Sequence, residues 1–120
     1  MRTKVSQTGL YTYPDVVVVC GEAQFEDAHL DTLLNPALIV EVLSESTESH
    51  DRGRKFAHYR SIESLQEYVL VSQLEPRIER FLRNREDWVY SECTETDGSM
   101  ELTSIRCRLS LRNTYLQVSF

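Results

Sequence analysis

The sequence predicts an α/β or α+β protein in which strands outnumber helices. Three apolar runs, residues 16–20, 38–43 and 67–72, have the length and composition of strands. One segment with helical spacing, about His50 to Arg60, lies between the second run and the third. The C-terminal part adds further strand-like runs, so we expect a sheet in which helices are the minority.

The N-terminal elements are expected to be strands. Residues 2–13 mix Thr, Val and Tyr, which is typical of an edge strand. Pro14 and Asp15 then interrupt the chain. The run 16–20, closed by Gly21, has the composition of a strand that is buried on both faces. The polar and acidic residues 22–31 predict a surface loop.

The middle of the chain is expected to hold a strand, a helix and another strand. Residues 38–43 form the first of these strands, and the hydroxyl-rich residues 44–49 suit the cap of the helix that follows. Helical spacing places Phe56 and Tyr59 on one face. Gly53 costs such a helix about 1 kcal/mol relative to alanine. The second strand is residues 67–72.

The C-terminal part predicts three more strands, at residues 77–82, 88–93 and 101–111, with a turn at 96–99 before the last one. Phe81 and Trp88 are expected in the core. A second basic group consists of Arg77, Arg80, Arg83 and Arg85. It is either a stripe that contacts phosphate or the solvated face of a strand.

Length and composition limit the class of protein. The 120 residues, 41% of them hydrophobic, with only 4 Gly and 3 Pro, predict one folded domain over 1–120. No apolar stretch approaches the roughly 20 residues of a membrane helix, and the polar start predicts no signal peptide. Three cysteines, far apart, indicate a reducing cytoplasm and no zinc site. The net charge of −6 excludes tight non-specific coating of nucleic acid, but it permits a local basic face.

Glu41 is the residue that most needs a chemical explanation. It lies inside the apolar run 38–43, where an ionised carboxylate must be paired, metal-bound or protonated. The strand period of two puts Ile39, Glu41 and Leu43 on one face, with Val40 and Val42 on the other. The residues leave two alternatives open, a metal ligand or a carboxylate at the margin of a sheet, paired with an arginine.

Asp15 is the second candidate, because it stands at the mouth of the preceding strand. Pro-Asp is also an ordinary turn dipeptide, so Asp15 alone indicates little. Together, Asp15 and Glu41 place two carboxylates on neighbouring strands, the kind of oxygen ligand that hard divalent cations prefer. A Mg²⁺ ion held there lowers the pKa of a bound water and neutralises charge on a phosphodiester.

The predicted helix carries several charged residues, with two interpretations. Asp51 and Lys55 are spaced i, i+4, which is typical of a surface ion pair. Alternatively, Lys55 points back at the carboxylate pair, where it orients the attacking water or steadies the phosphate. In that second interpretation the arginines of the same segment contact DNA phosphates; they are Arg52, Arg54 and Arg60.

Three linked motifs resemble those of a known family. They are Tyr13-Pro14-Asp15-Val16-Val17-Val18, then Asn35-Pro36 with Ile39-Val40-Glu41-Val42-Leu43-Ser44, then Asp51-Arg52-Gly53 with Lys55-Phe56 and Tyr59-Arg60. In this order they resemble the Uma-type family of putative restriction endonucleases, common in cyanobacteria and part of the PD-(D/E)XK nuclease superfamily. The similarity continues through residues 64–71 to the terminal strands, and so covers nearly the whole chain.

The resemblance implies a restriction-endonuclease-like fold, a mixed sheet flanked by helices, and Mg²⁺- or Mn²⁺-dependent cleavage of phosphodiester bonds in DNA. Asp15 matches the aspartate of the Pro-Asp motif, and Glu41 matches the second acidic ligand. Leu43 stands where the superfamily usually has its lysine. The resemblance implies that Lys55, from the following helix, takes that place. Tyr59 matches a motif residue that we expect to serve in packing.

The chain departs from the family pattern in two places. It has Ser44-Glu45-Ser46 where the family has Ser-Pro-Ser, which loosens the turn and adds a negative charge. Similar proteins begin well upstream, with a helical segment and further strands, so we expect an N-terminally shortened member or a piece of a longer protein. A truncated sheet edge leaves apolar surface uncovered, which favours a homodimer or loss of activity.

Three functions therefore compete. The first is a metal-dependent DNA endonuclease with catalytic Asp15, Glu41 and Lys55. The second is a truncated and inactive relative that acts as a nucleic-acid-binding or protein-interaction module. The third is an acidic structural or regulatory domain without a metal. Cleavage of a supercoiled plasmid, and the response of the melting temperature to the metal, separate the three.

Overall fold

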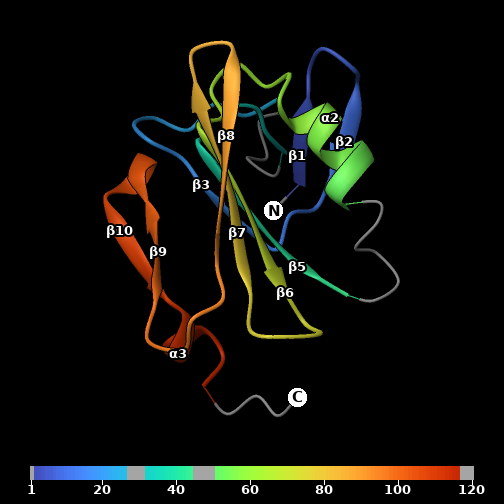
Figure 1. The fold of residues 1–120 in the computed structure, drawn as a ribbon. Coiled ribbons are helices and arrows are strands. Elements are labelled where there is room, and N and C mark those ends of the chain that lie inside the picture. Colours follow the sequence, from blue (N-terminus) through green and yellow to red (C-terminus); the bar gives the residue numbers. More distant parts are fainter. Residues whose placement is uncertain (1, 27–31, 45–50, 117–120) are drawn as a thin grey trace.

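The computed structural model describes residues 2–26, 32–44 and 51–116, with side chains from residue 53 onward in the last range (Figure 1). Strands dominate and helices are few, as the sequence predicts. No helix within these ranges is long and apolar enough to cross a membrane.

A five-stranded sheet in the order β3-β5-β6-β7-β8 forms the centre of the molecule. Its strands are β3 (Val16–Val18), β5 (Leu38–Leu43), β6 (Glu67–Ser72), β7 (Ile78–Asn84) and β8 (Asp87–Cys93). β5 and β6 are parallel, whereas the other neighbouring pairs are antiparallel. The predicted strands at 38–43 and 67–72 are confirmed residue for residue, and those at 77–82 and 88–93 within two residues.

The connection between β5 and β6 carries the helical segment. Parallel neighbours need a crossover, and here it contains a π-helical turn η1 (Asp51–Lys55) followed by α2 (Phe56–Tyr59). The predicted helix at 50–60 is thus confirmed in place, although it is split into two short turns. The predicted cap at 44–49 lies outside the described residues except for Ser44.

The N-terminal segment is a hairpin and not the single strand that we expected. β1 (Arg2–Val5) pairs antiparallel with β2 (Leu10–Thr12) and parallel with β4 (Thr32–Leu33). The turn between β1 and β2 uses Gly9 with φ of +75°, and both Thr8 and Gly9 donate their backbone N–H to the carbonyl of Val5. Glycine adopts this conformation without steric cost, which explains the reversal.

β3 is also different from its prediction. The run of valines suggested a strand buried on both faces, but β3 is an edge strand of three residues, and Val16 is 49% exposed. It pairs only with β5 in the described sheet, with Val16 opposite Val40. Apolar composition alone does not distinguish an edge strand from a central one, because both tolerate β-branched residues. The predicted loop at 22–31 is described only up to residue 26.

The predicted strand at 101–111 is instead part of a second hairpin. β9 (Ser99–Leu102) pairs antiparallel with β10 (Cys107–Ser110), and the short 3-10 turn η2 (Thr103–Ile105) joins them. Arg106 ends that turn in the left-handed region with φ of +54°. A last helical turn, α3 (Leu111–Thr114), follows, and the Ser110 side chain caps it.

Two apolar cores lie on the two faces of the central sheet. On one face, Ile39, Leu43, Tyr68 and Leu70 pack against the crossover, and Tyr59 is fully buried there. On the other, residues such as Leu38 and Val69 pack against β9, β10 and α3. Figure 1 shows α2 on one side of the sheet and the β9–β10 hairpin on the other. The predicted alternation along β5 is therefore confirmed.

A buried carboxylate fastens the hairpin to the sheet. Glu67, at the start of β6, is fully buried and accepts hydrogen bonds from the backbone N–H groups of Thr103 (3.1 Å) and Ser104 (2.5 Å). The guanidinium of Arg80 lies 3.8 Å from the same carboxylate. These contacts satisfy a charge that burial alone would make costly.

Candidate functional site

Glu41 lies in the middle of β5, which is a central strand and not a sheet margin. Its register partner on β6 is Leu70, and the residue is only 3% exposed. The side chain shares its face with Ile39 and Leu43, on the side covered by the crossover. A carboxylate in this apolar setting needs polar partners, and the crossover provides them.

Two side chains of the crossover contact the same carboxylate oxygen of Glu41. The Lys55 ammonium nitrogen lies 3.5 Å from Oε1, and the Tyr59 hydroxyl lies 3.0 Å from it. Lys55 and Tyr59 are four residues apart, so one turn of helix points both toward β5. The ion pair is shielded, since the side chains of Lys55 and Glu41 are 23% and 4% exposed. Glu41 thus contacts a lysine and a tyrosine of the crossover, on a strand that lies between β3 and β6 in the sheet.

Asp15 reaches β5 from the neighbouring edge strand. Val16 pairs with Val40 in the antiparallel register, and the next step of that register sets Asp15 opposite Glu41. The Asp15 carboxylate accepts a hydrogen bond from the Val42 backbone N–H, with 2.7 Å between Oδ2 and the nitrogen. Asp15 itself is exposed, in contrast to the buried Glu41.

The structure therefore brings Asp15, Glu41 and Lys55 to one end of the β3–β5 pair. It supports the interpretation in which Lys55 points back at the carboxylates. The competing ion pair with Asp51 involves a side chain outside the described part of the chain. Asp15 directly precedes the edge strand β3, Glu41 lies on β5, and Lys55 lies on the crossover.

The basic residues of the crossover are less closely tied to this site. Arg54 and Arg60 are exposed, and the Arg60 guanidinium lies 6.0 Å from the centre of the Phe56 ring. The side chain of Arg52 is not among those described. Both described arginines stand on the segment that supplies Lys55, which keeps positive charge near the carboxylates.

Tyr59 has a polar role that sequence reasoning missed. We expected it to pack, and its ring does lie edge-on to Tyr68, with 5.2 Å between ring centres. Its hydroxyl also lies 3.0 Å from Thr12 Oγ1, as well as 3.0 Å from Glu41 Oε1. The spacing of Tyr59 from Lys55 was the available signal, because i and i+4 side chains share a helix face.

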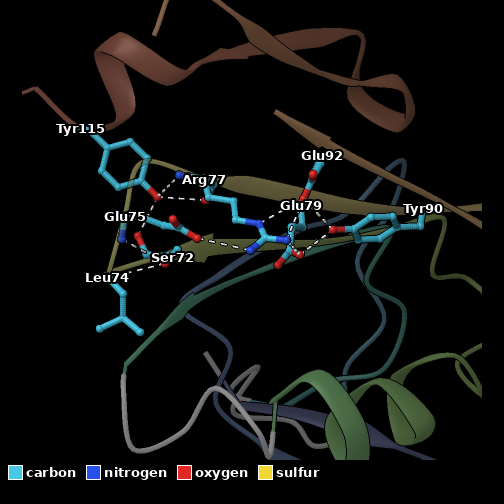
Figure 2. Close-up of polar contacts among 8 residues, drawn as sticks. All are labelled: Ser72, Leu74, Glu75, Arg77, Glu79, Tyr90, Glu92 and Tyr115. Carbon is cyan, nitrogen blue, oxygen red and sulfur yellow. Dashed lines mark hydrogen bonds and ion pairs between the residues drawn. The ribbon is translucent and has the colours of Figure 1, made fainter. Parts of the chain in front are cut away.

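A second polar cluster lies on β7 and β8, centred on Arg77 (Figure 2). Its guanidinium is held by three carboxylates, at 2.7 Å from Glu92 and 3.3 Å from both Glu75 and Glu79. Tyr90 donates its hydroxyl to the buried Glu79 at 2.5 Å. Partial desolvation of the Tyr90 hydroxyl and this hydrogen bond raise the pKa of Tyr90 to about 12, and the phenol and carboxylates raise the pKa of Arg77.

Three members of the second basic group make contacts within the molecule that neither prediction included. Arg77 is bound by carboxylates, Arg80 donates to the Glu101 carbonyl at 2.6 Å, and Arg83 donates to the Leu65 carbonyl at 2.6 Å. Their guanidinium groups are therefore held by carboxylates or backbone carbonyls of the same chain, and they are not simply the solvated face of a strand. Glu79 stands between Ile78 and Arg80, so its sequence neighbours did not mark it as buried in the way that the apolar run marked Glu41.

The donor chemistry at Asp15 and Glu41 suits a hard divalent cation. Across the described residues, no group of three or more His, Cys, Asp or Glu side chains gathers in a way that could hold a metal ion. Mg²⁺ in proteins commonly uses only one or two carboxylates, with waters and substrate phosphate completing the octahedron. The carboxylates of Asp15 and Glu41 fit that mode. The three cysteines are all free, and thiolates are not the ligands that Mg²⁺ prefers.

Comparison with known proteins adds three findings. The family model Uma2, described as "Putative restriction endonuclease", matches residues 1–113. Two proteins of Synechocystis, sll1609 and slr1290, are each 35% identical to the chain, over 88% and 100% of it. The chain spans 60% and 62% of their lengths.

A crystal structure described as a putative nuclease belonging to DUF820, from Anabaena variabilis, has a similar fold. The TM-score is 0.74 at 16% identity, over 95% of this chain and 64% of that one. At this identity the likeness concerns the fold alone. It confirms the mixed sheet with few helices that the motifs implied.

Proposed function

Because the chain belongs to the Uma2 family of putative restriction endonucleases, we propose that it carries the site of a metal-dependent DNA endonuclease. The observation that carries this proposal is the convergence of Asp15, Glu41 and Lys55. A buried carboxylate, an exposed carboxylate on the neighbouring strand and a half-buried ammonium group lie together. Carboxylate oxygens are the ligands that hard divalent cations prefer, and a positive group beside them can stabilise charge on a phosphate.

Asp15 and Glu41 would hold Mg²⁺ or Mn²⁺ through their carboxylate oxygens. When bound, such an ion lowers the pKa of a water and neutralises the charge that develops on a phosphodiester. Glu41 is fixed by the crossover, so its carboxylate is oriented before any ligand arrives. Asp15 is fixed through its bond to the Val42 N–H and is open to solvent on the side where DNA would approach.

Lys55 would act next to the carboxylates as the positive group. Its ammonium nitrogen lies 3.5 Å from Glu41 Oε1, a distance that allows a long side chain to turn toward a substrate phosphate. In that position it would orient the attacking water or stabilise the charged transition state. Leu43 stands where the superfamily usually has its lysine, and the place of Lys55 on the crossover supports a role for Lys55 in its stead.

DNA would approach over the crossover, where positive charge is local. The chain has a net charge of −6, so binding relies on few contacts and on the metal. Arg54 and Arg60 are exposed on that segment and would contact phosphates, together with Arg52. A cytoplasmic location, indicated by the cysteine usage, belongs to the same proposal.

The test is cleavage of supercoiled plasmid with Mg²⁺ or Mn²⁺ by the parent, Asp15→Asn and Glu41→Gln. We expect nicked and linear DNA from the parent and none from either variant. Glu79→Gln is the matched control, because Glu79 is also a buried carboxylate on the central sheet, but Arg77 and Tyr90 hold it. It should keep activity if the loss in the other variants is chemical.

Other outcomes would select the competing functions. Intact plasmid together with a melting temperature that rises with Mn²⁺ would indicate an inactive relative that binds metal and nucleic acid or protein partners. No response to the metal at all would indicate a structural domain. Sedimentation of the same preparation tests the expected homodimer. The chain spans about 60% of the length of the curated relatives that it matches, so a full-length relative should be assayed in parallel.

A further inference from the structure

The Tyr59 hydroxyl is a buried polar group placed between two strands. Its ring is fully buried, and the oxygen lies 3.0 Å from Thr12 Oγ1 on β2 and 3.0 Å from Glu41 Oε1 on β5. Thr12 is itself only 6% exposed. The hydroxyl therefore links the N-terminal hairpin, the crossover and the central sheet at one point.

The direction of these bonds follows from the number of protons. An ionised Glu41 has no proton to give, so Tyr59 must donate its single phenolic proton to Glu41 Oε1. The Tyr59 oxygen is then an acceptor toward Thr12, whose hydroxyl donates to it. The result is a directed chain, Thr12 to Tyr59 to Glu41, that ends on the carboxylate and is charge-assisted at its last step.

The ring geometry limits where the hydroxyl can lie. Tyr59 packs edge-on to Tyr68, and Phe56 of the same helical turn stacks on Tyr68 with 5.6 Å between ring centres. A phenol has only two side-chain torsions, so a packed ring leaves its oxygen little freedom. The Lys55 ammonium group, by contrast, is on a flexible stem and reaches the same Oε1 at 3.5 Å. Tyr59 is the rigid partner of the two.

We propose that Tyr59, supported by Thr12, is a positioning residue that holds the Glu41 carboxylate in the orientation required for divalent-metal binding. This inference rests on the proposed function. The hydrogen bond fixes the position of Oε1 and thereby limits the rotation of the carboxylate group that places Oε2. Partners of this kind around a metal ligand change metal affinity by roughly 10- to 100-fold.

The test measures Mn²⁺ affinity by calorimetry for the parent, Tyr59→Phe and Thr12→Val, all at a temperature where each is folded. We expect the dissociation constant to rise by about 10-fold or more in Tyr59→Phe and by less in Thr12→Val. Cleavage by Tyr59→Phe should recover at high Mn²⁺, because the chemistry of Asp15 and Lys55 is intact. A merely structural tyrosine would not produce that dependence on metal concentration.

Tyr115→Phe is the matched control for the loss of a tyrosine hydroxyl. Its hydroxyl bonds the backbone carbonyls of Ser72 and Arg77 on the other side of the molecule, and it should leave the Mn²⁺ affinity unchanged. Equal affinities for the parent and Tyr59→Phe would overturn this inference alone. A parent that does not bind Mn²⁺ would overturn the proposed metal site, and the inference with it.

Discussion

Asp15 accepts a hydrogen bond from the backbone of Val42 and thereby joins β3 to β5 at the residue next to Glu41. The carboxylate thus has a structural bond through Oδ2 in addition to the metal-binding role that we propose. The two roles are separable, because an amide oxygen can accept the same hydrogen bond but is a poorer ligand for a hard cation.

Replacing Asp15 separates stability from metal binding. The free energy of unfolding of Asp15→Asn should lie within about 0.5 kcal/mol of the parent's. That of Asp15→Ala should be about 1 kcal/mol lower, because the hydrogen bond is lost. In both variants the Mn²⁺ affinity should fall by more than the roughly 100-fold that is lost when a residue that only supports a metal ligand is replaced. Urea denaturation and calorimetry measure the two quantities. Strong Mn²⁺ binding by Asp15→Asn would remove Asp15 from the metal site.

Replacing Lys55 should affect cleavage more than metal binding. Lys55→Met keeps the apolar stem and removes the charge, so we expect the cleavage rate to fall by about 100-fold or more. Mn²⁺ should still bind, since both carboxylates remain. Lys4→Met is the control, because Lys4 pairs with Glu26 in the N-terminal sheet at 3.2 Å. A normal cleavage rate in Lys55→Met would assign Lys55 only to the ion pair.

Removing charge from the crossover should weaken DNA binding and its dependence on salt. Each arginine that no longer neutralises a phosphate should reduce the slope of log affinity against log salt by about 0.9. We expect this for Arg54→Gln and Arg60→Gln, measured by fluorescence anisotropy in a Lys55→Met background, which should cleave slowly and still bind the metal. Arg112→Gln, whose arginine pairs with Asp97 at the β9–β10 hairpin, should keep the parent slope. An unchanged slope in the crossover variants would place DNA elsewhere.

Tyr90 makes stability depend on alkaline pH. Its pKa is raised to about 12, first by burial and then by its hydrogen bond to Glu79. Because the folded pKa exceeds the ordinary value near 10, the stabilisation is complete below about pH 10 and is lost as pH rises through about 12. Urea denaturation over that window should show the fall. It should flatten in Tyr90→Phe and persist in Tyr13→Phe, since Tyr13 is 70% exposed.

The sequence was most informative where burial and period agreed. Residues 38–43 and 67–72 became β5 and β6 without change, because apolar runs of six fit strands buried on both faces. Glu41 stood out for the same reason, as a charge where only apolar residues belong. The position of Lys55 came from the resemblance and from helical spacing together.

The wrong predictions have a common physical cause. They occur where a turn or a distant pairing partner determines the strand boundaries or the side-chain contacts. Gly9 at φ of +75° and Arg106 at φ of +54° each help to reverse the chain between two strands. Gly9 is an ordinary turn residue that the single strand expected over 2–13 left out of account, whereas Arg106 gives no such signal. The bonds of Arg77 depend on the register of β7 with β8, where Glu79 faces Glu92. Long-range pairing of that kind is invisible to local patterns.

The parallel pairing of β5 with β6 has a consequence for how the family can diverge. The crossover that carries Lys55 and Tyr59 also connects β5 to its parallel neighbour β6, so it cannot be deleted without breaking that pairing. On the proposed function, a relative without catalysis can discard the ammonium group of Lys55, but Phe56 must still cover Tyr68. We therefore expect silenced relatives to be recognisable by a crossover whose aromatic residues persist while its charges drift.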